Sequence, residues 1–381
     1  MRTEMDLAIG DELLALAKAG SPPADRPADQ LNVDVYIDPD RHRRELAAIA
    51  AHPVPAVASS EVAEPGSFVT AELAGVPVII TRDRDGVVHA MRNVCAHRGA
   101  TVVTEPSGTS RIFSCGFHGW SYDLDGSLRA VSDKQRFSST DPCTTGLRRL
   151  ECEERHGMVW VTPDPDSPAK SVEAWLGAEL DELLVELGLP EMVHHATTEY
   201  DLGCNWKLLT DGFMELYHLK YLHRNSIAPY FPNDLTLNKR YGDHFIGWLP
   251  KNRVLRMLEE QPRDEWKVVD GCTAAFTLLP GTVIQWQAGH VELFSLRPHP
   301  TEPNRTTARL TMLVPGDRAD ETDLWDRNWE RVCVTIPDED FAAAVDVQRN
   351  IDAGAVDALQ IGFNEHKLVD HLAAVDQLIK D

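Results

Sequence analysis

Cysteine, basic residues and long apolar runs are all scarce in this chain of 381 residues. Its seven cysteines are too few for a disulfide framework, and an odd number cannot all pair within one chain. This predicts a reducing, cytoplasmic location. No apolar stretch approaches the roughly 18 residues that a membrane helix requires, and the acidic start of the chain lacks the pattern of an export signal. A formal net charge of −23 argues against nucleic acid and anionic membranes as partners.

The first half of the chain is expected to contain two helical segments and then a small β domain. Residues 1–52 are predicted to hold helices over 11–19 and 41–51, joined by a proline-rich linker at 21–29, and to pack on the C-terminal domain. Residues 53–165 are rich in short β-type segments, and Asp85-Gly86 between two of them is a hairpin signal. Pro163, Pro165 and Pro168 then mark a boundary.

Residues 166–381 are predicted to form a second, larger domain. Helical spacing of apolar residues occurs over 172–187, 206–221, 339–359 and 365–379, with four β-type segments between 273 and 314. Strands grouped between helices favour an antiparallel sheet covered by helices, the α+β class.

Two short segments each offer one thiolate and one imidazole: Cys95 with His97, and Cys115 with His118. If the two loops face each other, they give two cysteines to one iron and two histidines to the other, which is the ligation of a Rieske [2Fe–2S] cluster. Glycines at 99, 116 and 119 let the backbone close around such a cluster. The alternative is structural zinc, although zinc sites more often pair cysteine with cysteine on one knuckle.

A second group of ligand-type residues follows Asn205-Trp-Lys. Asp211, Glu215 and His218 share one face if a single helix runs through them, at about 100° per residue. His223 would lie roughly 140° around that helix from His218. Both histidines can bind one metal only if the helix ends or bulges over residues 219–222.

Two histidines and one carboxylate leave positions on a metal open for O2, as in non-haem Fe(II) oxygenases. The carboxylate must come from elsewhere in the chain, and Asp340 is the preferred source, with Asp338 and Asp346 as alternatives. Taken alone, these residues also fit an ordinary reading, in which histidines pack in a core and acids complement helix dipoles.

With both groups in view, the chain resembles the catalytic alpha subunit of the Rieske non-haem iron oxygenases, the aromatic-ring-hydroxylating family. Cys-x-His-Arg-Gly at 95–99, Cys-x-x-His-Gly-Trp at 115–120, and Asn-Trp-Lys with Tyr-His-x4-His at 205–223 match in order and spacing. The resemblance covers the chain from about residue 35 onward. It implies that Cys95, His97, Cys115 and His118 hold the cluster, and that His218, His223 and Asp340 hold a mononuclear Fe(II).

The resemblance also implies a helix-grip (START-like) catalytic domain and a head-to-tail ring, commonly a homotrimer. In such a ring Glu215 would link His218 to the His118 of a neighbouring subunit and carry the electron. The family more often has aspartate at that position. The chain has no Gly-x-Gly-x-x-Gly after a strand and no four-cysteine ferredoxin pattern, so a separate NAD(P)H-dependent reductase, with or without a ferredoxin, is implied.

The expected substrate is a small organic molecule, with an aromatic compound preferred. We expect it to be hydroxylated, cis-dihydroxylated or demethylated with O2. Phe213, Trp286 and His290 are candidate pocket residues, and Asn205 is a candidate either for the site or for capping a helix. An aromatic pocket would equally hold a quaternary ammonium group. The functional alternative is a Rieske electron-transfer protein without oxygenase chemistry.

Overall fold

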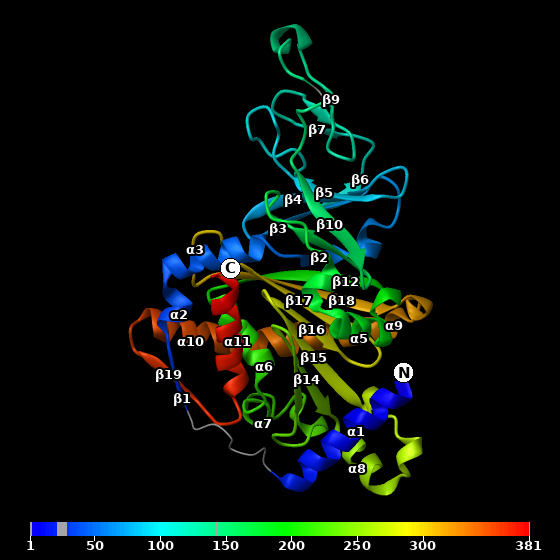
Figure 1. The fold of residues 1–381 in the computed structure, drawn as a ribbon, viewed down its shortest axis with the longest axis vertical. Coiled ribbons are helices and arrows are strands. Elements are labelled where there is room, and N and C mark those ends of the chain that lie inside the picture. Colours follow the sequence, from blue (N-terminus) through cyan, green and yellow to red (C-terminus); the bar gives the residue numbers. More distant parts are fainter. Residues whose placement is uncertain (1, 21–28, 142, 381) are drawn as a thin grey trace. The chain divides into compact units, whose positions relative to one another are not determined.

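The computed structural model describes residues 2–20, 29–141 and 143–380, so the predicted linker at 21–29 lies outside the described residues except for Asp29. Figure 1 shows the fold, which divides into two compact units. Residues 46–175 form one, called here the β unit, and residues 1–45 with 176–381 form the other, called the α+β unit. Within the described residues, no helix combines the length and apolar character needed to cross a membrane.

The β unit is built on an antiparallel seven-stranded sheet in the order β2-β11-β10-β5-β4-β3-β6, with a smaller sheet β7-β8-β9. Its strands are β2 (Val54–Ala58), β3 (Ser67–Leu73), β4 (Val76–Arg82), β5 (Val88–Arg92), β6 (Ser107–Thr109), β7 (Phe113–Ser114), β8 (Ser121–Tyr122), β9 (Leu128–Ala130), β10 (Arg149–Arg155) and β11 (Met158–Thr162). Strands β4 and β5 pair across Asp85-Gly86, and Gly86 has a φ of 84°, which confirms the predicted hairpin.

Two apolar clusters fill the β unit, one on each side of the large sheet. Because side chains alternate along a strand, Val78 and Ile80 of β4 join one cluster while Ile79 joins the other. The cluster around Ile79 also contains Cys95 and Cys115. The two cysteine loops are therefore anchored in a packed core rather than carried on free loops.

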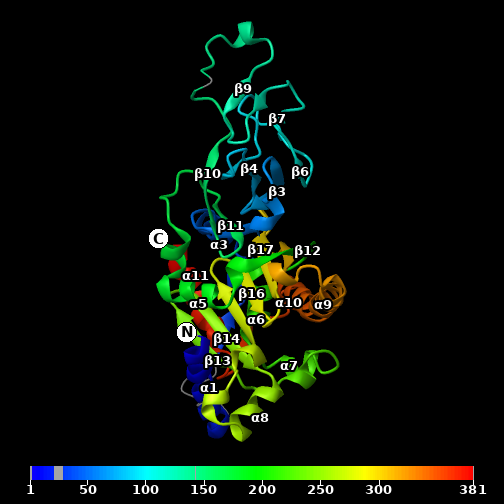
Figure 2. The ribbon, with the colours of Figure 1, turned by 90° about the vertical axis from the view of Figure 1, so that its right-hand side faces the viewer.

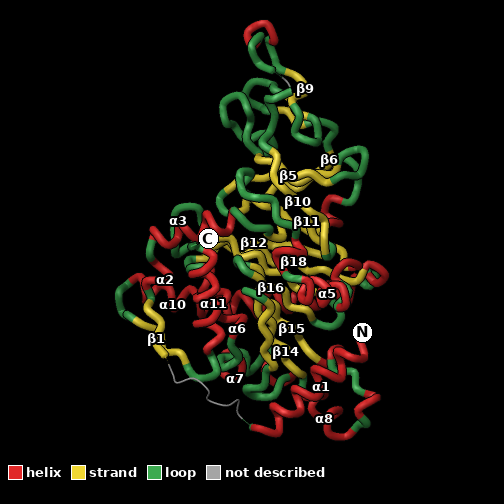
Figure 3. The backbone as a smooth tube through the Cα atoms, in the orientation of Figure 1, coloured by secondary structure: helices red, strands yellow, loops and turns green. Residues whose placement is uncertain are grey.

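The α+β unit contains an antiparallel seven-stranded sheet in the order β12-β18-β17-β16-β15-β14-β13. These strands are β12 (Met192–Leu202), β13 (Leu237–Tyr241), β14 (His244–Pro250), β15 (Cys272–Leu278), β16 (Thr282–Trp286), β17 (Val291–Pro298) and β18 (Thr306–Pro315), and β1 (Asp29–Asn32) pairs separately with β19 (Ala358–Ile361). Antiparallel sheets with helices confirm the predicted α+β class (Figure 3).

Helices cover this sheet, as the second view shows (Figure 2). The helices of the chain are α1 (Arg2–Ala19), α2 (Asp34–Ile37), α3 (Pro39–Ala50), α4 (Val172–Leu176), α5 (Ala178–Glu186), α6 (Trp206–Met214), α7 (Leu219–Leu222), α8 (Asn252–Glu260), α9 (Thr322–Thr335), the π-helix η8 (Ile336–Phe341), α10 (Ala342–Asp352) and α11 (His366–Leu378). Helix α6 packs against β15 and β17, and α10 and α11 pack on α6. The face of the sheet under α6 is thus closed by three helices.

Four predicted helices differ from those observed, and the first of them, expected over 11–19, already begins at Arg2. The helix expected over 206–221 ends at Met214, so Glu215 and His218 lie outside it. The helix expected over 339–359 begins earlier, because α9, η8 and α10 run on without a break from Thr322 to Asp352. The helix expected over 172–187 is divided at Gly177, whose φ of 82° a helix does not allow.

Helix α6 is held in place by buried polar groups at its N-terminus. Asn205 caps the helix through the backbone N–H of Lys207, at 3.0 Å. The Lys207 ammonium lies 2.6 Å from the Glu45 carboxylate, and each side chain is only 1% exposed. Glu45 also accepts hydrogen bonds from Arg41 and from the indole of Trp206. This network ties α6 to α3, and buried charges of this kind are costly to leave unpaired.

We expect Lys207→Met to lower the free energy of unfolding by about 2 kcal/mol, because the buried Glu45 carboxylate loses its ammonium partner and keeps only the guanidinium of Arg41. Urea denaturation measures this. The control is Lys239→Met, which removes a more exposed pair with Glu12 at 2.7 Å and should cost less than about 1 kcal/mol. Equal losses in the two variants would contradict the role given to the buried pair.

Candidate metal centres and the adjoining pocket

The two Cys-His loops of the β unit fold in the same way. In the first, the N–H of Cys95 donates to the carbonyl of Ala100 at 2.8 Å, and the N–H of Gly99 donates back to Cys95 at 2.9 Å. In the second, Cys115 pairs with Trp120 at 2.8 Å, and Gly119 with Cys115 at 2.9 Å. Gly99 and Gly119 have φ values of 75° and 69°, which glycine adopts without strain. Each loop is therefore a tight turn that begins at a cysteine.

The loops bring their two histidine rings together, and their two cysteines belong to one core cluster. The ring centroids of His97 and His118 are 4.6 Å apart, and the ring of His97 stacks on that of Trp120 at 4.9 Å. Cys95 and Cys115 are buried and form no disulfide. Nδ1 of His97 is buried without a hydrogen-bond partner among the described residues. Two free thiols and an unpartnered imidazole nitrogen are the donor set that a metal cluster requires.

Tyr122, which the sequence did not single out, supports the first loop. Its hydroxyl lies 3.1 Å from Sγ of Cys95, and the backbone N–H of Ala96 donates to it at 3.1 Å. Burial, followed by the hydrogen bond to the Cys95 thiol, raises the pKa of Tyr122. A tyrosine that stays protonated donates a hydrogen bond to a thiolate at this position.

His218, His223 and Asp340 converge in the α+β unit. Each offers a ligand atom, and these atoms lie within 4.8 Å of one another. Nε2 of His223 is 3.2 Å and Nε2 of His218 is 3.6 Å from Oδ1 of Asp340. The regular helix ends before His218, and the four-residue α7 lies between the two histidines, so the break required by their spacing is present. Asp338 and Asp346 do not join this group.

A carboxylate lies behind each of these histidines. Nδ1 of His218 donates to Glu215, and Nδ1 of His223 donates to Glu339. Glu339 also accepts a hydrogen bond from the Ser226 hydroxyl at 2.7 Å. Both rings therefore turn Nε2 toward Asp340, whose Oδ2 is buried without a partner. A histidine held by a carboxylate behind it is the usual support of a metal ligand.

Glu339 was missed from the sequence, because nothing in the spacing links it to His223. Burial alone would lower the pKa of His223, but its hydrogen bonds to Asp340 and Glu339 outweigh burial and raise it. Carboxylates thus surround a buried imidazole. A cation that replaces the proton of His223 meets three oxygen and nitrogen ligands already in place.

Asp211 does not belong to this site, which corrects the expectation of one face shared with Glu215 and His218. Its Oδ2 accepts a hydrogen bond from the Tyr36 hydroxyl at 2.7 Å, and its Oδ1 is buried without a partner. Burial raises the pKa of Asp211 to about 7. Because α6 ends at Met214, the chain turns away and carries Glu215 and His218 out of the helical register of Asp211.

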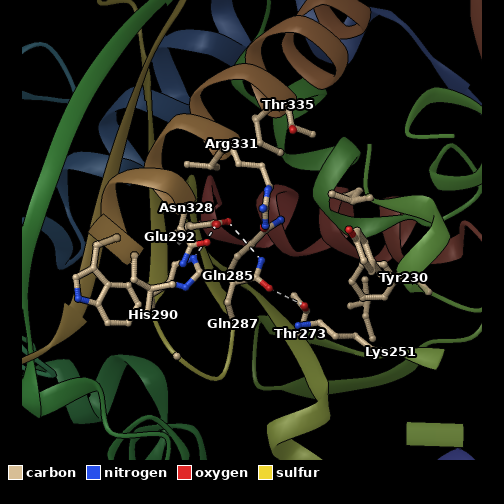
Figure 4. Close-up of a pocket in the computed structure, with 18 of the residues that line it drawn as sticks. Tyr230, Lys251, Thr273, Gln285, Gln287, His290, Glu292, Asn328, Arg331 and Thr335 are labelled. Carbon is tan, nitrogen blue, oxygen red and sulfur yellow. Dashed lines mark hydrogen bonds and ion pairs between the residues drawn. The ribbon is translucent and has the colours of Figure 1, made fainter. Parts of the chain in front are cut away.

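A cavity of about 500 Å³ within the α+β unit is lined by residues close in sequence to the candidate metal ligands, although His218, His223 and Asp340 do not line it themselves (Figure 4). It includes Leu219, the neighbour of His218, and Ile336, the first residue of the π-helix that carries Asp340. One wall is the sheet and the other is α9. The lining residues are Leu219, Ile227, Tyr230, Phe231, Leu249, Lys251, Thr273, Gln285, Gln287, Gly289, His290, Glu292, Arg318, Leu324, Trp325, Asn328, Arg331, Val332, Thr335 and Ile336.

Of the four pocket candidates from the sequence, only His290 lines this cavity, where its Nε2 donates to Glu292 at 3.1 Å. Phe213 instead packs its ring on Phe294 at 4.7 Å. Trp286 faces the other side of the sheet, because its neighbour Gln285 points into the cavity, and its indole donates to Leu187. Asn205 is buried as the cap of α6.

Comparison with known proteins gives matches over both units. Residues 189–380 match the family model of the ring hydroxylating alpha subunit (catalytic domain), and residues 52–143 match that of the Rieske [2Fe-2S] domain. The carnitine monooxygenase oxygenase subunit of Acinetobacter baumannii is 25% identical over 83% of this chain and 86% of its own length. The choline monooxygenase of Beta vulgaris is 31% identical, over 44% of this chain and only 38% of that protein.

Solved structures show the same fold. A quaternary ammonium Rieske monooxygenase aligns with a TM-score of 0.76 at 21% identity, over 94% of this chain and 99% of the other. A naphthalene 1,2-dioxygenase aligns with a TM-score of 0.75 at 19% identity, over 92% of each chain. At these identities the likeness extends to the fold alone.

We expect Asp211→Asn to stabilise the protein relative to the wild type more at pH 8 than at pH 5. The pKa of Asp211 rises from 3.8 to about 7 on folding, so the unfolded chain ionises first and the wild type loses stability as the pH rises through this range. The asparagine variant does not lose this stability, which amounts to about 3 kcal/mol between the two pH values. Urea denaturation at both pH values measures the difference, with exposed Asp264→Asn as control. A pH-independent difference would contradict the assignment.

Proposed function

The chain belongs to the ring hydroxylating alpha subunit family, with a Rieske domain ahead of the catalytic domain, and on this premise we propose which of its residues serve each centre and which reaction they serve. It is a Rieske non-haem iron oxygenase that uses a [2Fe–2S] cluster and a mononuclear iron. The alternative of an electron carrier without oxygen chemistry is therefore not retained. The convergence of His218, His223 and Asp340 beside a cavity carries the proposal.

Cys95 and Cys115 would hold one iron of the cluster, and His97 and His118 the other. The buried free thiols and the unpartnered Nδ1 of His97 fit that group. Desolvation, and then the charges of His118 and Arg98, lower the pKa of His97 and favour the neutral imidazole that binds a metal. His118 is exposed to solvent, which suits the ring through which an electron leaves the β unit.

His218, His223 and Asp340 would hold the mononuclear iron. When bound, the two metal groups supply the electron transfer and the activation of O2. The chain's own residues fix the ligands: Glu215 and Glu339 hold the two rings, and Oδ2 of Asp340 remains free to join Oδ1 on a metal. The cavity orients the substrate and limits the access of water to the reacting carbon.

Electrons would come from a separate NAD(P)H-dependent reductase, directly or through a ferredoxin. The cluster of one subunit would serve the iron of the next in a head-to-tail ring, through His118 and Glu215. Exposed aromatic side chains beside both residues support such a contact. Phe117 is 59% exposed next to His118, and Tyr217 and Tyr221 are 50% and 60% exposed around His218.

The proposed reaction inserts one oxygen atom at a carbon bound to nitrogen. The carbon–nitrogen bond then breaks, and the oxidised carbon fragment separates from the amine. Carnitine and choline monooxygenases among the relatives support this choice over dihydroxylation of an arene. Tyr230, Phe231 and Trp325 line the cavity and are the aromatic surfaces to which an alkylammonium group is attracted.

A single-turnover experiment tests this function. The anaerobically reduced protein is mixed with 18O2 and a panel of choline, γ-butyrobetaine, indole and naphthalene, and the products are analysed by mass spectrometry. We expect one labelled oxygen atom in the product of an alkylammonium compound, and no product from His223→Ala, which loses an iron ligand. The proposal fails if both metal centres are present and no compound is oxidised, or if His223→Ala remains active.

We expect Glu339→Gln to weaken iron binding about 10- to 100-fold, because an amide holds the His223 ring less firmly than a carboxylate. Chelator competition measures the affinity. Glu330→Gln, at an exposed position on α9, is the matched control and should bind iron as the wild type does. The cluster absorption should be the same in all three proteins. Unchanged iron affinity in Glu339→Gln would show that Glu339 does not support the ligand.

A further inference from the structure

The cavity beside the metal site has an unbalanced set of charges. Its charged lining residues are Lys251, Glu292, Arg318 and Arg331. Arg318 is already paired with Glu321 through two contacts of 2.7 Å. Glu292 is 7% exposed and accepts hydrogen bonds from His290 at 3.1 Å and Gln287 at 3.5 Å. Lys251 and Arg331 therefore face a single carboxylate, that of Glu292, so the lining keeps a net positive charge in a chain whose net charge is −23.

Those two cations are Arg331 and Lys251. Neither side chain makes a hydrogen bond or ion pair with any residue in the described part of the chain. Lys251 is half-buried, and burial, with the nearby guanidinium of Arg253, lowers its pKa, although the charge of Glu292 acts in the opposite direction. A bound anion would reverse that effect and compensate both positive charges. Surface arginines usually remain solvated, but this one points into a concave site that also holds an unpaired lysine.

Arg331 is presented by one face of α9. Trp325, Asn328, Arg331, Val332 and Thr335 recur every three or four residues and line the cavity together. Figure 4 shows the Arg331 side chain reaching from this helix toward Gln285 on the sheet, with Lys251 on the other side of the cavity near Thr273. Arg331 is an exposed residue, and its guanidinium extends from α9 into the cavity toward the sheet.

Strand register determines which side chains of the sheet point into the cavity. Leu249 pairs with Thr273, and Gln285 pairs with Glu292, so side chains at these positions emerge on the same face. The amide of Gln285 has no hydrogen-bond partner among the described residues, nor has that of Asn328 on α9. Neutral donors thus accompany the cations, while the carboxylate of Glu292 is engaged by His290 and Gln287.

We propose that the substrate carries a carboxylate, and that Arg331 binds this group through two guanidinium N–H donors while Lys251 adds a second positive charge. Arginine suits this role because its planar fork matches the two oxygens of a carboxylate. The proposal rests on the proposed function, since it assigns the cavity to the substrate of that reaction, and it narrows that substrate to an organic anion or zwitterion.

The same geometry orients the substrate. Arg331 and Asp340 belong to one continuous helical run, nine residues apart, which corresponds to roughly 13 Å along a helix axis. The carboxylate would bind toward the Arg331 end, and the carbon to be oxidised would lie toward Leu219 and Ile336. A molecule that spans this cavity has several bonds between its carboxylate and its reacting carbon.

Ligand binding to the purified protein tests the proposal without requiring turnover. The probes are γ-butyrobetaine, hexanoate and 4-phenylbutyrate, each with its primary amide, titrated by calorimetry. We expect at least one carboxylate to bind about 10- to 100-fold more tightly than its amide. Arg331→Gln should abolish that preference, and Arg331→Lys should restore only part of it, because lysine is a point charge. Lys251→Gln should reduce it less.

Arg327→Gln is the matched control, because Arg327 lies on α9 one turn before Arg331 and does not line the cavity. It should bind every probe as the wild type does. The proposal is overturned if the amides bind as well as the carboxylates, or if Arg331→Gln keeps the preference for the carboxylates. Iron and sulfide analysis of the same sample reports on the oxygenase function separately, so the two proposals fail independently.

Discussion

Two histidines can serve one metal only if something holds their rings, and in this chain that support comes from two carboxylates behind them. Glu215 fixes His218 and Glu339 fixes His223, so both Nε2 atoms turn toward Asp340. The rest of the site depends on this arrangement. The helix must end before His218, and the π-helical turn must present Glu339 and Asp340, adjacent in sequence, to one place. Widened helical turns of this type are frequent at functional sites.

The helical run from Thr322 to Asp352 joins the metal site to the cavity. Its first part, α9, provides the wall that carries Arg331, and its π-helical part provides Asp340. The proposed substrate anchor Arg331 and the candidate metal ligand Asp340 therefore share one continuous helical element, whose π-helical part packs on α6. The buried Lys207–Glu45 pair in turn holds α6 in place. A charge pair that lies outside the candidate metal site therefore stabilises the helix that packs against it.

Much of this could be predicted from local sequence. The spacing of Cys95 with His97 and Cys115 with His118 already indicated two similar loops, and Asp85-Gly86 indicated a hairpin. Tertiary features could not be predicted. Glu339 supports His223 across 116 residues, and no periodicity encodes such a contact. The face of Trp286 depends on a one-residue register, which β16 leaves open because apolar residues occur on both of its faces. Helix α9 was missed because only a few of its positions are buried.

Counting the metals most directly tests whether this chain carries both centres. Iron, zinc and acid-labile sulfide are quantified in anaerobically purified protein, and EPR spectra are recorded before and after reduction with dithionite. We expect about three iron and two sulfide per chain, with a Rieske-type signal that appears on reduction. Zinc without sulfide would contradict the assignment of the Cys-His loops and, with it, the oxygenase function.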